Sequence, residues 1–165
     1  DMEEMGEQVL VEPFIKGREL TVAVMDGKAL AVTEIIPAEG WYDYEAKYAD
    51  GGSRHIIPAQ IPEEITQLCM RWAEKAHIAL GCRGLSRADL FYAPDGDYPA
   101  AANFKEKNTD INAVLTDIVN KVIMLEVNTQ PGMTATSLAP EQAIYTGLSF
   151  NQLCRWIVED ATWPR

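Results

Sequence analysis

Alternating apolar and polar positions along the chain predict strands on either side of a tight turn. Leu20 to Met25 and Lys28 to Ile36 flank Asp26-Gly27, a dipeptide typical of hairpin turns, so we expect these segments to pair as antiparallel strands. Leu85 to Tyr92, which is followed by turn residues, predicts another strand. Val9 to Val11 predicts a short strand that a proline ends.

The clearest helical spacing of apolar residues follows Pro62. This proline opens the predicted helix, Glu63 and Glu64 complement the positive end of its dipole, and Gly81 ends it. We expect the apolar stripe of this helix to pack into the core, and the stripe consists of Ile65, Leu68, Cys69, Trp72, Ala73 and Ala76.

Two shorter helices are predicted towards the end of the chain, from Pro140 to Gly147 and from Phe150 to Val158. In the second helix, Leu153, Trp156 and Ile157 share the apolar side. Strands and helices do not alternate as they do in βαβ units. The predicted fold class is therefore α+β, with a largely antiparallel sheet flanked by helices.

The segment between Asp97 and Met124 has a weaker pattern. We expect its first part, up to Asn108, to be an exposed excursion from the fold. The second part has apolar residues at helical spacing behind Asp110, a good N-cap, and these residues are Ile111, Val114, Leu115, Ile118, Val119 and Val122. This spacing predicts a helix on the surface.

Length and charge narrow the class of protein. A chain of 165 residues with 47% hydrophobic and 24% charged residues is long and apolar enough to form one globular domain with a buried core. The net charge of −11 argues against binding to nucleic acid or to anionic membranes, because both need a basic surface. Any phosphate group must therefore be bound by a few local residues.

The cysteines and the chain ends indicate a cytosolic setting. Cys69, Cys82 and Cys154 are an odd number without C-x-x-C spacing, so neither a disulfide framework nor a zinc site is expected. No apolar stretch is long enough to cross a membrane and no charged and then apolar segment opens the sequence, so we expect neither a spanning helix nor a secretory signal. The acidic start, residues 1–8, runs directly into a predicted strand, so we expect a fragment of a larger protein.

Oxygen-bearing side chains gather on two predicted strands. If Met124 to Asn128 is a strand, Glu126 and Asn128 project from the same face, and Asp89 on the earlier strand adds a third hard ligand. Mg²⁺ prefers carboxylate, substrate phosphate and water oxygens. The Pro131-Gly132 turn allows backbone N–H groups to approach a charged oxygen. A solvated strand edge has the same spacing, so these residues alone leave both interpretations open.

The combined sequence resembles a known family. The segment Leu125 to Thr134, together with Arg87-Ala88-Asp89, is similar to the carboxy-terminal part of the ATP-grasp ligases, and specifically of the D-alanine–D-alanine ligases. The resemblance runs from Val9 to Ile157 and implies that residues 1–165 form a carboxy-terminal ATP-grasp portion. The family has a shorter link before the metal-binding strand, so residues 97–123 are expected to be an insertion, either a surface helix or a partner site.

The resemblance implies a nucleotide site at the start of the chain. Glu12, Pro13 and Ile15 lie in a segment similar to the adenine-binding edge of the family, where Glu12 would accept a hydrogen bond from the exocyclic amine. Glu19 falls where the family has a carboxylate that accepts hydrogen bonds from the ribose hydroxyls. Taken singly, Glu12 and Glu19 would be ordinary surface charges.

The loop from Tyr42 to Tyr48 is similar to the lid that covers the active site in this family. Lys47 would reach the γ-phosphate of ATP, and the aromatic residues, Tyr42 among them, would exclude water from a labile acylphosphate. Members that form a dipeptide carry tyrosine where Tyr48 stands, whereas relatives that use D-lactate carry phenylalanine. The resemblance thus implies dipeptide synthesis, although the loop alone would suggest a solvated turn.

Further positions match residues that act on the amino acids. Arg87 is similar to the residue that stabilises the oxyanion of the tetrahedral adduct, assisted by the Gly132 N–H. Ser137-Leu138 resembles the segment that binds the carboxylate of the second D-alanine, although a serine there is also a good helix cap. The resemblance also implies the metal ligands. Asp89, Glu126 and Asn128 correspond to the residues that bind two Mg²⁺ or Mn²⁺ ions in this family, and Glu126 would bridge the two ions.

The implied reaction has two steps and needs more than this chain. ATP phosphorylates one D-alanine, and the amine of a second D-alanine displaces phosphate, which makes a precursor of bacterial peptidoglycan in the cytoplasm. The family also has an amino-terminal and a central domain that hold the first D-alanine and the phosphates, and it allows a homodimer of the full enzyme. We therefore expect this portion to be inactive by itself.

Two alternatives remain open at this stage. The acceptor could be D-lactate or D-serine instead of a second D-alanine. The chain could also be a nucleotide-binding or assembly module that does not catalyse a reaction. His55 and His77 lie in no motif and are expected to be ordinary surface or core residues.

Overall fold

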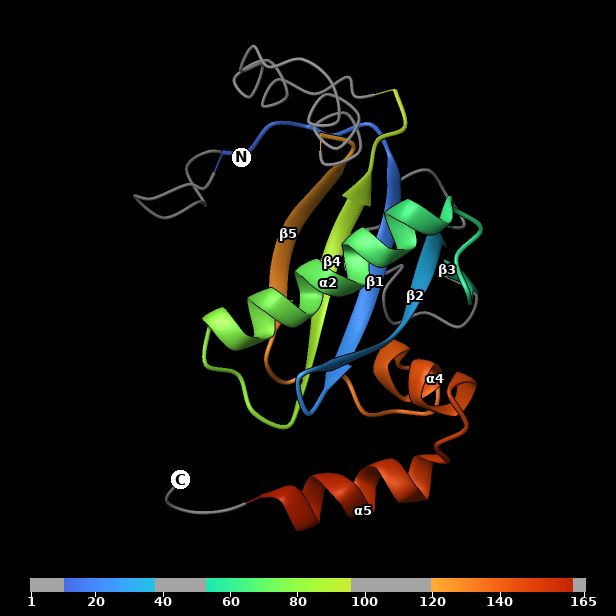
Figure 1. Ribbon diagram of the computed structural model, residues 1–165. Coiled ribbons are helices and arrows are strands. Elements are labelled where there is room, and N and C mark those ends of the chain that lie inside the picture. The colour runs from blue at the N-terminus through green and yellow to red at the C-terminus, as the bar shows by residue number, and fades with distance from the viewer. Residues whose placement is uncertain (1–10, 38–52, 96–119, 162–165) are drawn as a thin grey trace, which may run out of the picture.

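The computed structural model describes residues 11–37, 53–95 and 120–161, and Figure 1 shows their arrangement. In chain order the elements are β1 (Arg18–Met25), β2 (Lys28–Pro37), β3 (Ser53–Ile56), α2 (Glu63–Ala79), β4 (Leu85–Tyr92), β5 (Val122–Asn128), α4 (Leu138–Tyr145) and α5 (Phe150–Asp160). The strands form one sheet in the order β3-β2-β1-β4-β5, and every neighbouring pair is antiparallel. The predicted α+β class is confirmed.

The hairpin between β1 and β2 forms where the sequence predicts it. Asp26 and Gly27 both have positive φ angles, 51° and 73°, as a type I′ turn requires. Met25 pairs with Lys28 directly beside this turn. The turn therefore sets the register of the central strand β1 and its neighbour β2 up to Val24, beyond which the register shifts.

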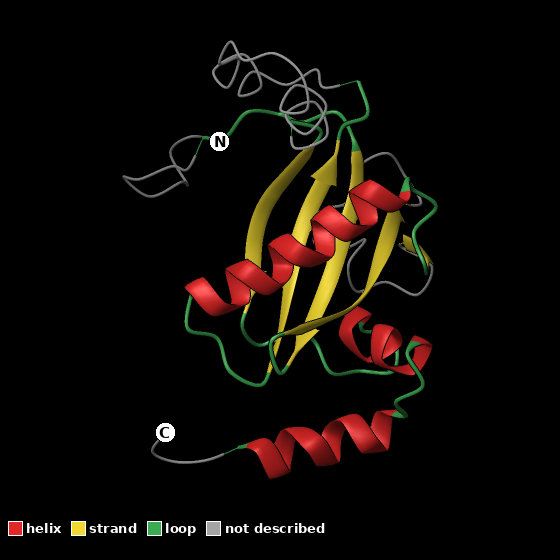
Figure 2. Ribbon diagram, in the orientation of Figure 1, coloured by secondary structure: helices red, strands yellow, loops and turns green. Residues whose placement is uncertain are grey.

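Helix α2 covers one face of the sheet, and Figure 2 shows it lying across the strands. Its predicted stripe is confirmed, because Ile65, Leu68, Cys69 and Ala73 are buried and Trp72 packs against the same cluster. The strands contribute the residues of the other side of this core, which are Leu20, Val22, Val24, Val32, Ala88, Leu90, Tyr92 and Val122.

Helices α4 and α5 pack on the opposite side. There Ala139 and Ala143 of α4 and Leu153 of α5 form a second core with Ala23 and Leu85. Residues 20, 22 and 24 of β1 thus contact α2, whereas residues 21 and 23 face the α4 side, as the alternation of a strand demands. Arg87 and Asp89 of β4, which alternate with Ala88 and Leu90 of the α2 core, also face the α4 side.

Three predictions about elements need correction. Val122 begins β5 and does not continue a helix, because it pairs with Tyr92 across the sheet. Val11 is 86% exposed and belongs to no strand, because it has no strand neighbour; residues 9 and 10 lie outside the described residues. Strand β3, which pairs with β2, was not predicted at all because only four residues form it.

Cys69, Cys82 and Cys154 are all free thiols, and burial raises the pKa of Cys69 to about 12, so this thiol is inert near neutral pH. None of the helices within the described ranges is long and apolar enough to cross a membrane.

His77 gives the fold a predicted dependence on pH. Its imidazole is 4% exposed and shares a 2.7 Å hydrogen bond with Ser86, and burial lowers its pKa, an effect that the charge of Asp26 opposes. The unfolded chain therefore binds a proton more readily, and stability should fall as the pH drops below about 6.5. In denaturation curves across this range, His77→Gln should flatten the slope; an unchanged slope would rule out His77 as the cause.

Candidate active site

Strands β4 and β5 bring the predicted oxygen ligands together. Asp89 pairs with Glu126, and Arg87 pairs with Asn128, so the four side chains stand on neighbouring strands. The Asn128 amide nitrogen donates to Asp89 Oδ2 at 2.9 Å and to Glu126 Oε1 at 3.1 Å. One amide group therefore links two carboxylates that are far apart in the sequence.

A β-bulge at Leu125 allows this arrangement. Asp89 pairs with Glu126 but Leu90 pairs with Met124, so Leu125 is an extra residue in β5. Val122 and Met124 pack against the α2 core, and a regular alternation would have turned Glu126 and Asn128 into that core as well. The bulge reverses the alternation and turns the polar pair to the α4 side.

Asp89 is held by three side chains. Arg87 donates to it from Nε at 2.9 Å and from Nη2 at 2.7 Å. Thr21, which is fully buried on β1, donates from Oγ1 to Asp89 Oδ1 at 2.7 Å, closer than its 3.2 Å contact with the Ala88 carbonyl. With Asn128, these bonds fix both carboxylate oxygens of a residue that is only 7% exposed.

The donor set fits a hard divalent cation. Two carboxylates and one amide oxygen are ligands that Mg²⁺ and Mn²⁺ accept, and Asn128 would bind through its oxygen. Across the described ranges, no three His, Cys, Asp or Glu side chains form a metal-binding group by themselves. An ion here would therefore need Asn128 and oxygens from phosphate or water.

The predicted nucleotide-binding residues lie on β1, near Thr21, and in the segment that precedes β1. Glu19 is two residues from Thr21 on β1 and thus on the same face of the sheet as Asp89. Pro13 and Ile15 belong to the irregular segment before β1, as does the exposed Glu12. Tyr42, Lys47 and Tyr48 lie outside the described residues.

The turn after β5 closes around the Ser137 hydroxyl. Ser137 Oγ accepts from the Thr134 N–H at 2.9 Å and lies 2.8 Å from Thr134 Oγ1. A Cβ atom added to Gly132 would be 2.8 Å from the same oxygen, so the loop is tightly closed at this point. Ser137 occupies the N-cap position of α4, but its side chain bonds back into the loop, and Leu138 is buried behind it.

Helix α4 carries two polar residues whose contacts the sequence analysis did not predict. Gln142 is fully buried; its Oε1 accepts from the Ala23 N–H at 2.7 Å and its Nε2 donates to the Thr21 carbonyl at 3.1 Å. Glu141 Oε2 lies 2.9 Å from His55 Nδ1 of β3. The signal for Gln142 was its place between Ala139 and Ala143 in an apolar helix stripe, where a polar residue needs a buried partner.

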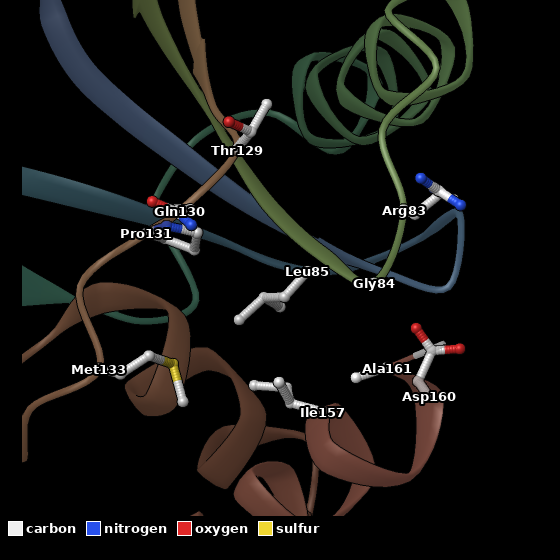
Figure 3. Close-up of a pocket in the computed structure, with 10 residues that line it drawn as sticks. All are labelled: Arg83, Gly84, Leu85, Thr129, Gln130, Pro131, Met133, Ile157, Asp160 and Ala161. Atoms are coloured by element: carbon white, nitrogen blue, oxygen red, sulfur yellow. The ribbon is translucent and has the colours of Figure 1, made fainter. Parts of the chain in front are cut away.

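A separate pocket of about 490 Å³ lies beside the loop after β5 (Figure 3). It is mainly apolar, and none of the proposed metal or nucleotide residues lines it. The lining residues come from the start of β4, the loop and α5, and they are Arg83, Gly84, Leu85, Thr129, Gln130, Pro131, Met133, Ile157, Asp160 and Ala161. The oxygen cluster and this pocket are therefore different sites.

Comparison with known sequences agrees with the geometry. The family profile for the D-ala D-ala ligase C-terminus matches residues 1–109 and 110–159. A D-alanine–D-alanine ligase from a Ruegeria strain is 51% identical over 163 residues, covering 99% of this chain and 46% of the relative. Another from Cereibacter sphaeroides is 50% identical over 98% of this chain and 46% of its own length. The chain thus spans about half the length of the curated relatives it matches.

Solved structures give the same result. The D-alanine–D-alanine ligase from Bacillus anthracis complexed with ATP has a TM-score of 0.60 and 28% identity, covering 89% of this chain and 40% of that chain. The VanG D-Ala:D-Ser ligase from Enterococcus faecalis has a TM-score of 0.62 and 30% identity, over 88% of this chain and 36% of that chain. Because the family profile covers nearly all residues and the fold agrees, the chain belongs to the D-alanine–D-alanine ligase family, of which it is the carboxy-terminal ATP-grasp portion.

Proposed function

We propose that the full protein containing this chain joins two D-alanines to D-alanyl-D-alanine at the expense of ATP, through an acylphosphate, for peptidoglycan synthesis in a bacterial cytoplasm. The chain would supply the half of the site that binds metal, ATP and the second D-alanine, and it would be inactive alone. The main observation in support of this proposal is that Asp89, Glu126 and Asn128 form a cluster in a chain of this family.

Each part of the cluster has a role in this reaction. Bound Mg²⁺ or Mn²⁺, two ions in the proposed form, would offset the charge of the transferring phosphoryl group. Asp89, Glu126 and Asn128 would hold these ions, and Arg87 would stabilise the oxyanion formed when the second amine attacks. The Gly132 N–H would help Arg87, while Ser137 and Leu138 would hold the carboxylate of the attacking amino acid.

The nucleotide would lie along the adjacent strand. Glu19 would accept hydrogen bonds from the ribose, and the backbone around Glu12, Pro13 and Ile15 would meet adenine. The lid would contribute Lys47 to the γ-phosphate, with Tyr42 and Tyr48 excluding water and favouring an amine acceptor. The position of Glu19 on the same face as Asp89 supports this direction for the nucleotide.

Reconstitution tests this proposal directly. This chain is mixed with the amino-terminal and central portion of the same protein, and ATP hydrolysis is measured with and without D-alanine and Mg²⁺. The expected result is phosphate release that needs both portions, the metal and D-alanine. Release by this chain alone, or release that ignores D-alanine, would contradict the proposal.

A D-alanine–D-serine ligase is the second candidate, because the VanG D-Ala:D-Ser ligase shares the fold at 30% identity. Ligation assays on the full protein with D-alanine, D-serine and D-lactate as acceptors separate these possibilities. We expect D-alanine to give the highest kcat/KM. A higher value with either other acceptor would move the assignment to that substrate.

The tight turn predicts the effect of a small substitution. Gly132→Ala would place a methyl group 2.8 Å from Ser137 Oγ, which Thr134 holds in place, so the hydroxyl must move. We expect KM for the second D-alanine to rise about tenfold, the equivalent of one lost hydrogen bond. Steady-state kinetics of the full protein measure it. Ser137→Ala serves as the control: if displacement of Ser137 is the cause, the two effects will not add in the double variant.

A further inference from the structure

Helix α4 packs on the central strand through Ala139 and Ala143, and one buried amide adds hydrogen bonds between the helix and this strand. Gln142 is fully buried and uses both ends of its side chain, accepting from the Ala23 N–H at 2.7 Å and donating to the Thr21 carbonyl at 3.1 Å. A buried polar group left without such partners would destabilise the protein. The two hydrogen bonds therefore restrict both the distance and the orientation of the helix relative to β1.

The strand needs this partner because its pairing is irregular here. Val22 pairs with Val32 but Val24 pairs with Ala29, so Ala23 has no paired residue in β2. This irregularity is a β-bulge between β1 and β2. Beside it, the Gln142 amide forms the hydrogen bonds with β1 that a peptide group of β2 would form in a regular sheet. Since the same strand carries Thr21, whose hydroxyl donates to Asp89 at 2.7 Å, the helix and the oxygen cluster are held by neighbouring atoms of one residue.

The loop between β5 and α4 is thus fixed at both ends. At its start, Asn128 is bonded to Asp89, and at its end, Gln142 ties α4 to β1. The proposed seat for the second amino acid, Gly132 to Leu138, lies between these two points. The Gln142 contact therefore helps to set the distance from this seat to the oxygen cluster, together with the packing of α4 on β1.

We propose that Gln142 is a positioning residue that holds the acceptor-binding loop at the correct place relative to the metal-binding carboxylates. The inference rests on the proposed function, because it assigns Ser137 and Leu138 to the second D-alanine. Gln142 touches no substrate and acts through α4. Its loss should therefore impair acceptor binding while leaving the nucleotide and metal side largely intact.

The test uses the full protein with Gln142→Met, which keeps the length of the side chain and removes both hydrogen bonds. We expect KM for the second D-alanine to rise about tenfold or more, while the affinity for Mn²⁺-ATP, measured by titration calorimetry without turnover, stays within about twofold. Hydrogen exchange of the amides in residues 133–139 should become faster. An unchanged acceptor KM in a folded variant would overturn the inference.

Two further variants distinguish a loss of positioning from a general loss of stability. Leu68→Ala removes core packing on the opposite face of the sheet and should lower the melting temperature without separating acceptor KM from nucleotide affinity. Gln142→Glu restores function if its buried carboxyl stays protonated, since it then donates and accepts like the amide. With the carboxyl neutral at low pH, this variant should keep acceptor KM within about threefold of the unaltered protein, and the rise should grow as the pH is raised and the carboxyl ionises. A rise as large as in Gln142→Met that does not change with pH would overturn the inference.

The outcomes also separate this inference from the proposed function. If the unaltered full protein makes no D-alanyl-D-alanine or related product, the proposed function fails. If the unaltered protein is active but Gln142→Met changes acceptor KM and Mn²⁺-ATP affinity by the same factor, the proposed function stands and the positioning role of Gln142 is wrong.

Discussion

Replacing Glu126 with glutamine in the full protein is expected to lower ATP-dependent phosphate release by at least about 10³-fold. In the proposed function Glu126 bridges the metal ions, and losing such a carboxylate removes several kcal/mol of stabilisation from the transferring phosphoryl group. The substitution keeps the shape of the side chain and its contact with Asn128. It removes only one negative charge. The measurement is the initial rate of phosphate release at saturating ATP, D-alanine and Mg²⁺.

The matched control is Glu159→Gln on α5. Glu159 is an exposed glutamate paired with Arg155 at 2.7 Å, far along the chain from the oxygen cluster, so the same loss of charge there should leave the rate unchanged. The expected loss is about 10³-fold. If Glu126→Gln instead retains roughly a tenth or more of the unaltered rate, the carboxylate does not hold the catalytic ions. Unchanged biological activity would favour the non-catalytic module.

Replacing Arg87 with lysine is expected to lower kcat by about 10² to 10³, the usual effect of losing an oxyanion donor. Arg87 donates to both oxygens of Asp89 from two nitrogens of one planar group. A lysine ammonium is a point charge that cannot reproduce this paired contact and also reach an oxyanion. The variant should therefore affect both the orientation of Asp89 and the second step of the reaction.

The two steps are measured separately for Arg87→Lys. Formation of D-alanyl-D-alanine should fall more than the D-alanine-dependent release of phosphate, because the acylphosphate can still form and be hydrolysed. Arg155→Lys, an exposed arginine on α5, is the control and should behave like the unaltered protein. A change confined to KM, with kcat intact, would show that Arg87 binds substrate without stabilising the transition state.

Local patterns predicted most of the elements because their signals lie within a few residues. The Asp26-Gly27 pair specifies a turn with two positive φ angles, and this turn defines where β1 ends and where β2 begins. The bounds of β4 agree with the prediction, Leu85 to Tyr92, since glycines and a proline flank it. Helix α2 follows from Pro62 and its acidic first turn.

The errors have a common cause. Val122 has a helical spacing with the residues before it, but its burial under α2 and its pairing with Tyr92 make it part of a strand. Short β3 has no periodicity of its own and exists only because β2 offers a free edge. In both places, contacts between residues far apart in the chain decided the structure.

The amino-acid sequence by itself predicted the hairpin, helices α2, α4 and α5, the family and the oxygen-bearing side chains of β4 and β5, because these depend on neighbouring residues and on the spacing of motifs. Only the tertiary structure decided that the bulge at Leu125 turns Glu126 and Asn128 towards Asp89, and that Thr21 and Gln142 support the cluster from β1 and α4. The physical reason is that strand register and buried hydrogen bonds arise from packing between distant segments, which no local pattern specifies.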